Sequence, residues 1–211
     1  MTIDNPRKRI SAIDAGDPQG LHLSYQYDGV GNVTDIGDDR SGMSQEFEFD
    51  HPVTVPLHFL TPEMDVPIVP VFINGLIPPL PSAARCYALG ARIRQALTGM
   101  PGSVRVAAVA SGSFSLEVGG PRLSATSHTG IPDPDWAGRV LDLMRTGDVG
   151  MLVAEASEER LTHAGNAAGE LLTWIAMLGV IGPGPTVFLE AQPEFGHAFG
   201  CWLAGDRRGH G

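Results

Sequence analysis

Residues 171–181 are the stretch that most constrains how this chain folds, because Thr173 is the only polar side chain between Leu171 and Ile181. A helix that is apolar on every side is a buried helix. Glu170 stands immediately before this stretch. A carboxylate at the mouth of a buried helix loses water and needs a cation, a metal ion or good hydrogen-bond donors. The sequence therefore predicts a buried helix over about residues 167–180, with Glu170 as a candidate metal-binding or catalytic group.

A purely structural role is the alternative for Glu170. Asn166 is of a residue type that caps helix N-termini, and an acid in the first turn complements the positive end of the helix dipole. The residues alone leave both interpretations open.

Composition limits the class of protein. The 211 residues suggest one domain or slightly more, and 43% hydrophobic residues are enough for a sizeable core. A net charge of −10 argues against a nucleic-acid surface, and no apolar run reaches the length of a membrane span. Two distant cysteines, Cys86 and Cys201, predict neither a disulfide scaffold nor a zinc site, so we expect a reduced, cytoplasmic setting.

Candidate strands and helices alternate after Glu46, which favours an α/β fold. Residues 1–45 look weakly ordered, apart from a possible edge strand at 21–27, and residues 205–211 form a tail. The apolar run 104–110 is the strongest buried-strand signal. The other candidate strands are 47–50, 66–73, 186–190 and 198–203, and the candidate helices are 83–97 with Ser82 as its cap, 135–146 and 157–164.

Histidines and serines supply the other candidate functional groups. An Asp50–His51 pair at a turn suits acid–base work, and it precedes a strand-like stretch that ends at His58. Two histidines and Glu170 match the composition of a two-histidine, one-carboxylate iron site, although the spacing of His51 and His58 is not a recognised one. A turn histidine without a function is the alternative. Ser113 and Ser115 lie in a small-residue turn that lacks the G-x-S-x-G arrangement of a hydrolase nucleophile.

From about Glu46 to Leu203 the chain resembles the class III extradiol ring-cleavage dioxygenases of the protocatechuate and gallate type. The match is carried by five short segments in a shared order. They are Phe49–Leu60, Pro67–Gly75, Pro78–Gly90, Ser111–Pro121 and Gly165–Met177.

The resemblance implies a three-layer α/β/α domain over residues 46–204 with a mixed, largely buried sheet. It also implies Fe(II) held by two histidines and one glutamate, which binds a catechol-type substrate and O2 side by side. Glu170 matches the glutamate ligand, and His51 matches a histidine near the substrate. Asn166 and Gly169 would shape the turn that presents Glu170, beside a pocket that includes Ser113, Ser115 and Leu116.

Two positions depart from the family pattern. Leu116 stands where the family has an acid–base histidine, and leucine cannot transfer a proton. The loss of such a group typically lowers the rate about 10²–10⁴-fold. The two iron-binding histidines of the family lie in an N-terminal segment for which residues 1–45 show no match, since His22 is their only histidine.

Three interpretations follow, in this order. The first is a ring-cleavage dioxygenase by descent, impaired as an isolated chain. The second is a non-catalytic binding or partner subunit of the same fold, completed by another chain in a homo- or hetero-oligomer. The third is an unrelated α/β hydrolase that uses Ser113 or Ser115. We expect small aromatic substrates such as catechol, protocatechuate or gallate, with O2, and neither nucleic acid nor membrane as a partner.

Overall fold

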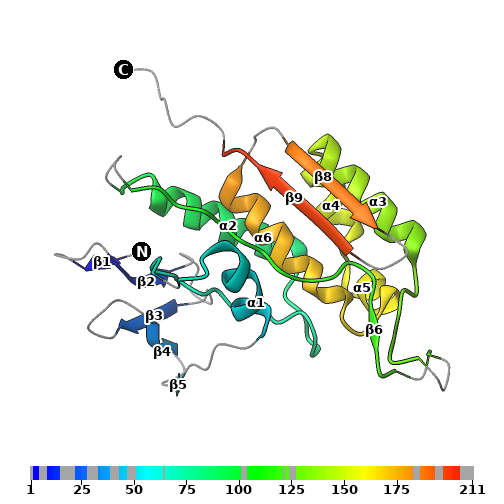
Figure 1. Ribbon diagram of the computed structural model, residues 1–211, viewed down its shortest axis with the longest axis horizontal. Helices are drawn as coiled ribbons and strands as arrows, with labels where there is room; N and C mark the ends of the chain where they lie inside the picture. Colours follow the sequence, from blue (N-terminus) through cyan, green and yellow to red (C-terminus); the bar gives the residue numbers. More distant parts are fainter. Residues whose placement is uncertain are drawn as a thin grey trace. The chain divides into compact units, whose positions relative to one another are not determined.

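The computed structural model divides the chain into two compact units, Met1–Phe72 and Ile73–Gly211 (Figure 1). It describes residues 2–4, 9–14, 22–27, 33–38, 43–46, 51–63, 65–100, 104–120, 122–123, 127–182, 186–192 and 197–204. Side chains are described from residue 52 onward within these ranges, except that of His197. Each unit is described by itself. The alternating stretch predicted at 47–50 lies outside the described residues.

The first unit holds a five-stranded antiparallel sheet in the order β1-β2-β3-β4-β5. The strands are β1 (Thr2–Asp4), β2 (Arg9–Asp14), β3 (His22–Tyr27), β4 (Val33–Asp38) and β5 (Met43–Glu46). The strand predicted at 21–27 is present as β3, but its placement at an edge is wrong, since β3 pairs with both β2 and β4. Short connections let consecutive strands pair locally, although their many Asp and Gly residues weaken the strand pattern in the sequence.

Residues predicted to be strand-like after His51 form a helix instead, α1 (His51–Leu60). The β-branched residues Val53, Thr54 and Val55 suggest a strand, but strand preference depends strongly on context. Pro52 fits in the first turn, where backbone N–H groups have no acceptor within the helix. At the other end the N–H and the hydroxyl of Thr61 both donate to the carbonyl of Leu57, at 2.7 and 3.1 Å, which closes the last turn.

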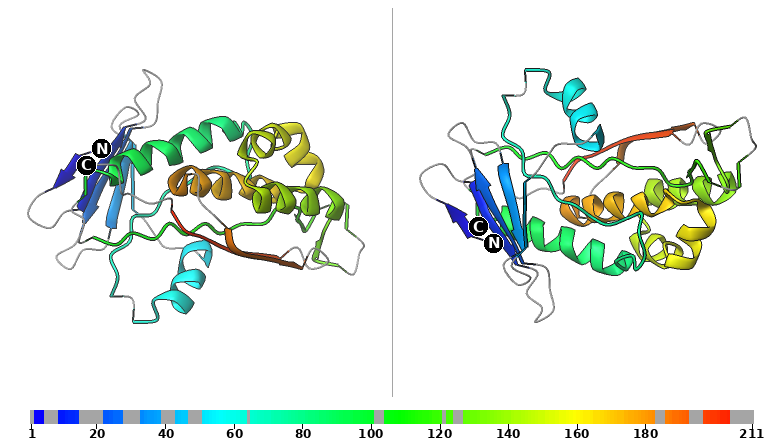
Figure 2. Two further views of the ribbon diagram at one scale, coloured as in Figure 1. Left: turned by 90° about the horizontal axis from the view of Figure 1, so that it is seen from above. Right: turned by 90° about the horizontal axis from the view of Figure 1, so that it is seen from below.

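The core of the second unit is built on α2 (Ala83–Leu97) packed against α6 (Leu171–Ile181). The Ser82 hydroxyl caps α2 by accepting from the N–H of Arg85 at 3.3 Å, as predicted. The predicted buried helix is also confirmed, because Leu171, Leu172 and Ile175 are completely buried. The two helices touch through glycine, since a Cβ at Gly90 would overlap the carbonyl of Ala176. Figure 2 shows α6 lying between α2 and the β8–β9 hairpin.

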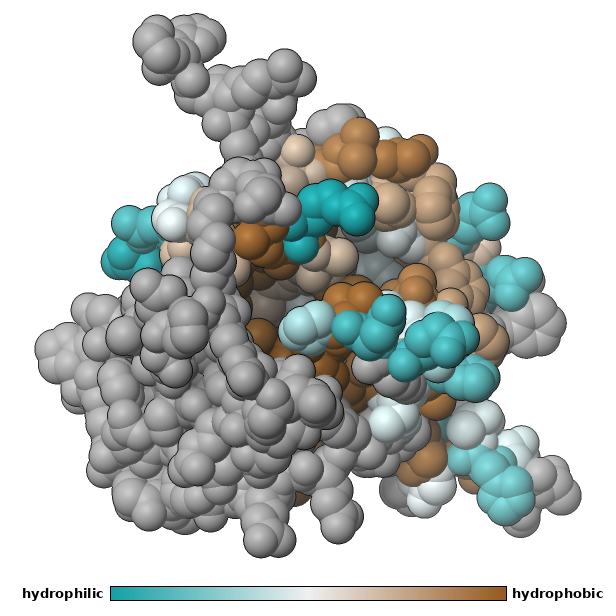
Figure 3. All heavy atoms as spheres, turned by 60° about the vertical axis from the view of Figure 1, so that its left-hand side comes forward, coloured by the Kyte–Doolittle hydropathy of each residue, from teal (hydrophilic) through white to brown (hydrophobic). Residues whose placement is uncertain are grey.

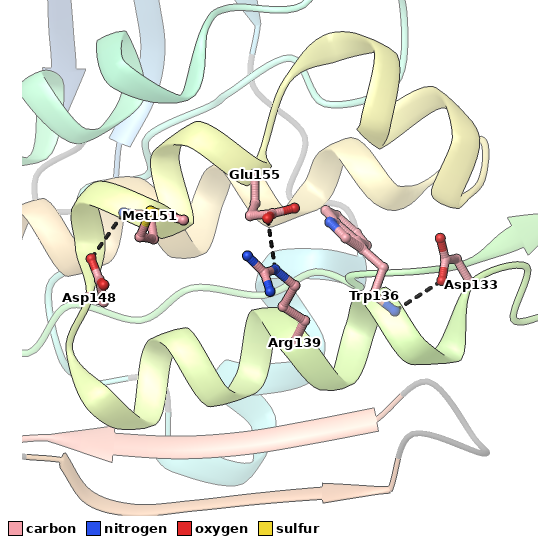
Figure 4. Close-up of polar contacts among 6 residues, drawn as sticks. All are labelled: Asp133, Trp136, Arg139, Asp148, Met151 and Glu155. Carbon is pink, nitrogen blue, oxygen red and sulfur yellow. Dashed lines mark hydrogen bonds and ion pairs between the residues drawn. The ribbon is translucent and has the colours of Figure 1, made fainter.

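Three helices pack beside this pair: α3 (Pro134–Thr146), α4 (Val149–Glu155) and α5 (Glu158–Ala164). The first and third match the predicted helices, whereas α4 is additional. Asp133 and Asp148 cap α3 and α4 by accepting from the N–H groups of Trp136 and Met151, at 2.9 and 3.0 Å. Arg139 Nε donates to Glu155 Oε1 at 2.7 Å and joins the two helices (Figure 4).

The remaining strands form two antiparallel pairs, β6 (Glu117–Val118) with β7 (Thr129–Gly130) and β8 (Thr186–Gln192) with β9 (His197–Trp202). The strands predicted near 186–190 and 198–203 are therefore confirmed. Helices and small sheets together place the chain in the α/β class. No helix among the described residues is long and apolar enough to cross a membrane.

Two predicted strands, 66–73 and 104–110, are not strands in the structure. The prolines at 67 and 70 remove two N–H donors from the first run. The second run finds no hydrogen-bonded partner strand among the described residues. Its central residues are exposed, with Val106 and Val109 at 45% and 56%, so the prediction of a buried strand is wrong here. On the face that Figure 3 presents, apolar residues, coloured brown, are exposed beside polar residues, coloured teal.

Candidate active site

Glu170 lies at the junction of a short 3-10 helix (Ala168–Glu170) and α6, where its side chain is half-buried. Its carboxylate does not cap its own helix. Instead, Oε2 accepts a hydrogen bond of 2.8 Å from the backbone N–H of Ser113, 57 residues away in sequence. The carboxylate therefore faces the 111–116 turn.

Asn166 does not cap α6 either. Its side-chain oxygen accepts from the N–H of Val118 at 2.9 Å, and its amide nitrogen donates to the carbonyl of Val118 at 2.8 Å. The capping role considered for Asn166 is therefore wrong, because its side chain bonds to Val118. Asn166 fastens its loop to β6, and Glu170 reaches across to Ser113.

The 111–116 turn is joined to the start of α6 by several further bonds. The hydroxyl of Thr173 donates to the carbonyl of Ser111, and the indole N–H of Trp174 donates to that of Gly112, both at 3.0 Å. Gly112 has a positive φ of 153°, and a Cβ there would lie 2.6 Å from the Cβ of Glu170. The close approach of the turn to Glu170 therefore requires glycine at this position.

A third segment approaches from residues 74–75. Gly75 and Gly169 meet backbone to backbone, since a Cβ on Gly75 would lie 2.6 Å from the carbonyl oxygen of Gly169. Asn74 fixes the turn that follows by accepting from the N–H groups of Leu76 and Ile77, at 3.2 and 3.0 Å. Three segments distant in sequence therefore converge beside Glu170.

The two candidate serines have different surroundings. Ser115 is 1% exposed, and its hydroxyl donates to the carbonyl of Ala164 and accepts from the N–H of Asp133, both at 2.9 Å. An activated nucleophile is exposed to its substrate and bonds to a base, whereas this buried hydroxyl bonds to two backbone groups. Ser113 is half-buried, and it is its backbone that contacts Glu170. This geometry does not favour a hydrolase.

Leu116 is half-buried and follows Ser115 on the same turn. Its carbonyl accepts from the N–H of Ala167 at 3.0 Å, so the backbone of this position is also tied to the loop before Glu170. Gly165, with φ of 136°, packs directly against that carbonyl. An aliphatic side chain at this position supplies no proton-transfer group.

The candidate histidines and Glu170 belong to different units of the chain. His51 and His58 lie on α1 in the first unit, and the side chains of His51 and His22 are outside the described residues. The ring of His58 contacts that of Phe59 edge-on, at 5.5 Å between centroids. Within the part of the chain that the structure describes, no group of three His, Cys, Asp or Glu residues is placed to hold a metal ion.

Sequence reasoning missed Glu117, Thr173, Trp174 and Gly75 as neighbours of this region. Glu117 is only 3% exposed, and its Oε2 accepts from the N–H of Asn166 at 3.0 Å. The one available signal was an acid placed between apolar residues and two glycines. Trp174 also packs edge-on against Phe114, at 5.0 Å between ring centroids.

A surface hollow of about 370 Å³ lies away from these residues, lined in part by Arg122, Arg160 and His163. The Arg122 guanidinium already donates to the carbonyls of His163 and Thr162, at 2.7 and 3.0 Å. That arginine therefore neutralises the C-terminal end of α5, where carbonyl groups disfavour an anion. None of the residues predicted for the site lines this hollow.

Comparisons with known proteins identify relatives of this chain. Gallate dioxygenase of Pseudomonas putida is 33% identical over 153 residues, which cover 67% of this chain and 43% of the relative. The 2,3-dihydroxyphenylpropionate/2,3-dihydroxicinnamic acid 1,2-dioxygenase of Burkholderia vietnamiensis is 26% identical over 208 residues, which cover 78% of this chain and 65% of the relative. The chain thus spans about half to two thirds of the length of these relatives. No solved structure matches it significantly.

A family model described as the catalytic LigB subunit of aromatic ring-opening dioxygenase matches residues 28–198. The match reaches further toward the N-terminus than the resemblance seen from Glu46 onward. It includes all three segments that converge at Glu170. The chain therefore belongs to the family of catalytic LigB subunits of aromatic ring-opening dioxygenases.

Proposed function

We propose that this chain contributes the carboxylate ligand of a non-heme Fe(II) centre that opens catechol-type aromatic rings with O2. The observation that carries the proposal is the setting of Glu170. One of its oxygens is held by the N–H of Ser113 at 2.8 Å, and the other has no hydrogen-bond partner among the described residues. A half-buried carboxylate with one oxygen fixed and one unused suits a metal ligand, because ligating carboxylates are themselves usually hydrogen-bonded.

Glu170 fits one ligand position, and the described residues contain no group of three or more His, Cys, Asp or Glu side chains that could hold a metal ion. Further ligands would come from residues outside the described geometry or from another chain. Bound iron would supply the site at which substrate hydroxyls and O2 meet. We propose that His51 lies on the substrate side, and that Ser113, Ser115, Leu116, Asn166 and Gly169 shape the pocket wall and the turn that presents Glu170.

The substrate class follows from the relatives. Their names specify gallate, 2,3-dihydroxyphenylpropionate and 2,3-dihydroxicinnamic acid, all of which carry adjacent ring hydroxyls. We propose a small aromatic compound with adjacent hydroxyls, such as a catechol, protocatechuate or gallate, as substrate here, with O2 as co-substrate. Leu116 leaves the proton transfers of ring opening without a side-chain acid at that position, so a low rate is expected.

A second candidate function is a partner subunit that binds without catalysing, and the apolar run 104–110 favours it. This run has exposed β-branched residues and no partner strand among the described residues, and both are features of a sheet edge that another polypeptide covers. We propose that such pairing, in a homo- or hetero-oligomer, completes a mixed, buried sheet and gives the three-layer α/β/α arrangement.

The deciding experiment is an anaerobic Fe(II) titration of the purified chain. Binding near one equivalent that Glu170→Ala removes supports the proposal, provided that Glu155→Ala leaves it intact. Glu155 is a suitable control because its carboxylate is held by Arg139 on a different pair of helices. An absence of Fe(II) binding would contradict a self-sufficient site and favour the partner-subunit function. Binding that survives Glu170→Ala would rule out Glu170 as the ligand.

Leu116→His tests the catalytic part of the proposal in a chain that binds iron. Restoring an acid–base group at this position is expected to raise oxygen uptake with a catechol by about 10²-fold or more. Leu116→Gln is the control, since it adds polarity without a group that titrates near neutral pH. No gain from histidine over glutamine would place the turn outside the reaction site.

A further inference from the structure

Two polar side chains are buried among the described residues, Ser115 and Glu117, at 1% and 3% exposure. Both contact the segment that leads into Glu170. Ser115 donates to the carbonyl of Ala164, and Glu117 accepts from the N–H of Asn166. Burying a carboxylate is costly unless donors compensate it. The buried polar contacts of this unit are thus concentrated on one short segment.

Asn166 is held at both its backbone and its side chain. Its N–H donates to Glu117 Oε2 at 3.0 Å, and its side chain makes two bonds to the backbone of Val118, at 2.9 and 2.8 Å. The next residue, Ala167, donates to the carbonyl of Leu116 at 3.0 Å, and the N–H of Glu170 donates to the carbonyl of Ala167 at 3.1 Å. A continuous chain of bonds therefore runs from Glu117 to the backbone of Glu170.

The Glu117 side chain is also confined from the other side. Its carboxyl group occupies the space that a Cβ on Gly120 would need. A side chain at position 120 would therefore displace the Glu117 carboxyl group from this position. The buried carboxylate has a defined position and a backbone donor to bind, which is the requirement for orienting a neighbouring group.

We propose that Glu117 is a positioning residue for Glu170. By holding the N–H of Asn166, it fixes the loop 165–169 so that the Glu170 carboxylate meets the N–H of Ser113. The importance of this positioning rests on the proposed function of Glu170 as a metal ligand. The geometry itself is measurable without metal.

Residue-resolved hydrogen exchange and NMR of the full chain test the proposal. Glu117→Met keeps the bulk of the side chain but removes the acceptor, and we expect the Ser113 amide to exchange about tenfold faster or more, because a bond to a charged group is lost. We expect the amides inside α2 to keep their wild-type exchange rates, because the lost bond holds only the loop 165–169.

Glu117→Gln is the rescue variant, since its amide oxygen still accepts from Asn166, and we expect Ser113 exchange within about threefold of wild type. Glu155→Met removes a different part-buried carboxylate and should leave Ser113 unchanged. A merely structural Glu117 would speed exchange at amides inside α2 and at Ser113 alike.

A folded Glu117→Met protein with wild-type exchange at Ser113 would overturn the proposal. Should Glu117→Met fail to fold, Glu117→Asp replaces it, because it shortens the reach by one methylene and predicts the same loss at Ser113. These readouts need no iron. A failed Fe(II) titration would therefore contradict the proposed function without changing this result.

Discussion

Two apolar stretches of the chain, α6 and the run 104–110, differ in burial. Helix α6 is buried, with Leu171, Leu172 and Ile175 at 0% exposure, whereas Val106 and Val109 in the run 104–110 are 45% and 56% exposed. Side-chain chemistry alone would place both in a core. The difference lies in the backbone. A helix satisfies its N–H and C=O groups internally, and a strand depends on a partner.

Packing of α6 against α2 needs only two helices with complementary faces, and both are present in the second unit. The run 104–110 needs a neighbouring strand on at least one edge and a covering layer on each face. The described residues provide no hydrogen-bonded neighbour for it. The described residues of this unit therefore supply every partner that the buried helix needs, but they supply no partner strand for the run 104–110.

Truncating one residue in each stretch is expected to give the largest difference in the free energy of unfolding. Ile175→Ala is expected to lower the free energy of unfolding by about 2–5 kcal/mol, because it leaves a cavity in a fully packed core. Val109→Ala is expected to change it by no more than about 0.5 kcal/mol, since the residue is exposed. Urea denaturation followed by circular dichroism measures both values.

A loss of unfolding free energy for Val109→Ala that approaches the loss for Ile175→Ala would contradict this expectation. That outcome would mean that the run is covered in solution. Repeating the measurement over a range of protein concentrations would then separate a second copy from a cover within the chain, because association makes stability depend on concentration.

The contact between α2 and α6 allows a second test, with a smaller expected effect on stability. Gly90→Ala is expected to destabilise the chain by about 1–3 kcal/mol, because its Cβ would overlap the carbonyl of Ala176 on α6. Gly138→Ala on α3 is the matched control. No atom lies within 4 Å of its added Cβ, so alanine should stabilise that helix by about 0.5–1 kcal/mol. Equal effects from the two substitutions, seen as equal shifts in Tm, would contradict the close contact of α2 with α6.

Local signals explain which parts of the fold were predictable. The Ser82 cap and the apolar run after Glu170 each define a helix within about one turn, so α2 and α6 follow from the sequence. The helix at His51–Leu60 was missed because its β-branched residues and prolines suggest extended chain, and tertiary context decides such cases. The strand predicted at 104–110 was wrong because pairing is non-local and cannot be inferred from one run.

The candidate site was predictable only in part. A lone acid before an apolar helix singled out Glu170, and a small-residue turn singled out 111–116. Their contact through the Ser113 N–H joins residues 57 apart. Glu117 gave no comparable signal, because an acid in a turn is usually solvated and its burial becomes evident only from the fold. The assignment of His51 stays a prediction, since its side chain is outside the described residues.

The two cysteines test the same contrast between a buried and an exposed segment through their reactivity. Cys86 is buried on α2, and Cys201 is exposed on β9. Burial raises the pKa of the Cys86 thiol to about 11 from 9.0, against the opposing effect of the nearby Arg85 charge. Because only the thiolate reacts, alkylation of Cys86 near pH 8 should be roughly a hundredfold slower in the folded chain than in urea, while Cys201 is modified readily. Mass spectrometry of peptides after timed iodoacetamide labelling measures both rates.

Since the unfolded thiol loses its proton first, the contribution of Cys86 to stability is complete below pH 9 and falls as the pH rises toward 11. Equal labelling of both cysteines in the folded chain would show that the α2–α6 core opens, and the contrast with the 104–110 run would then lose its basis.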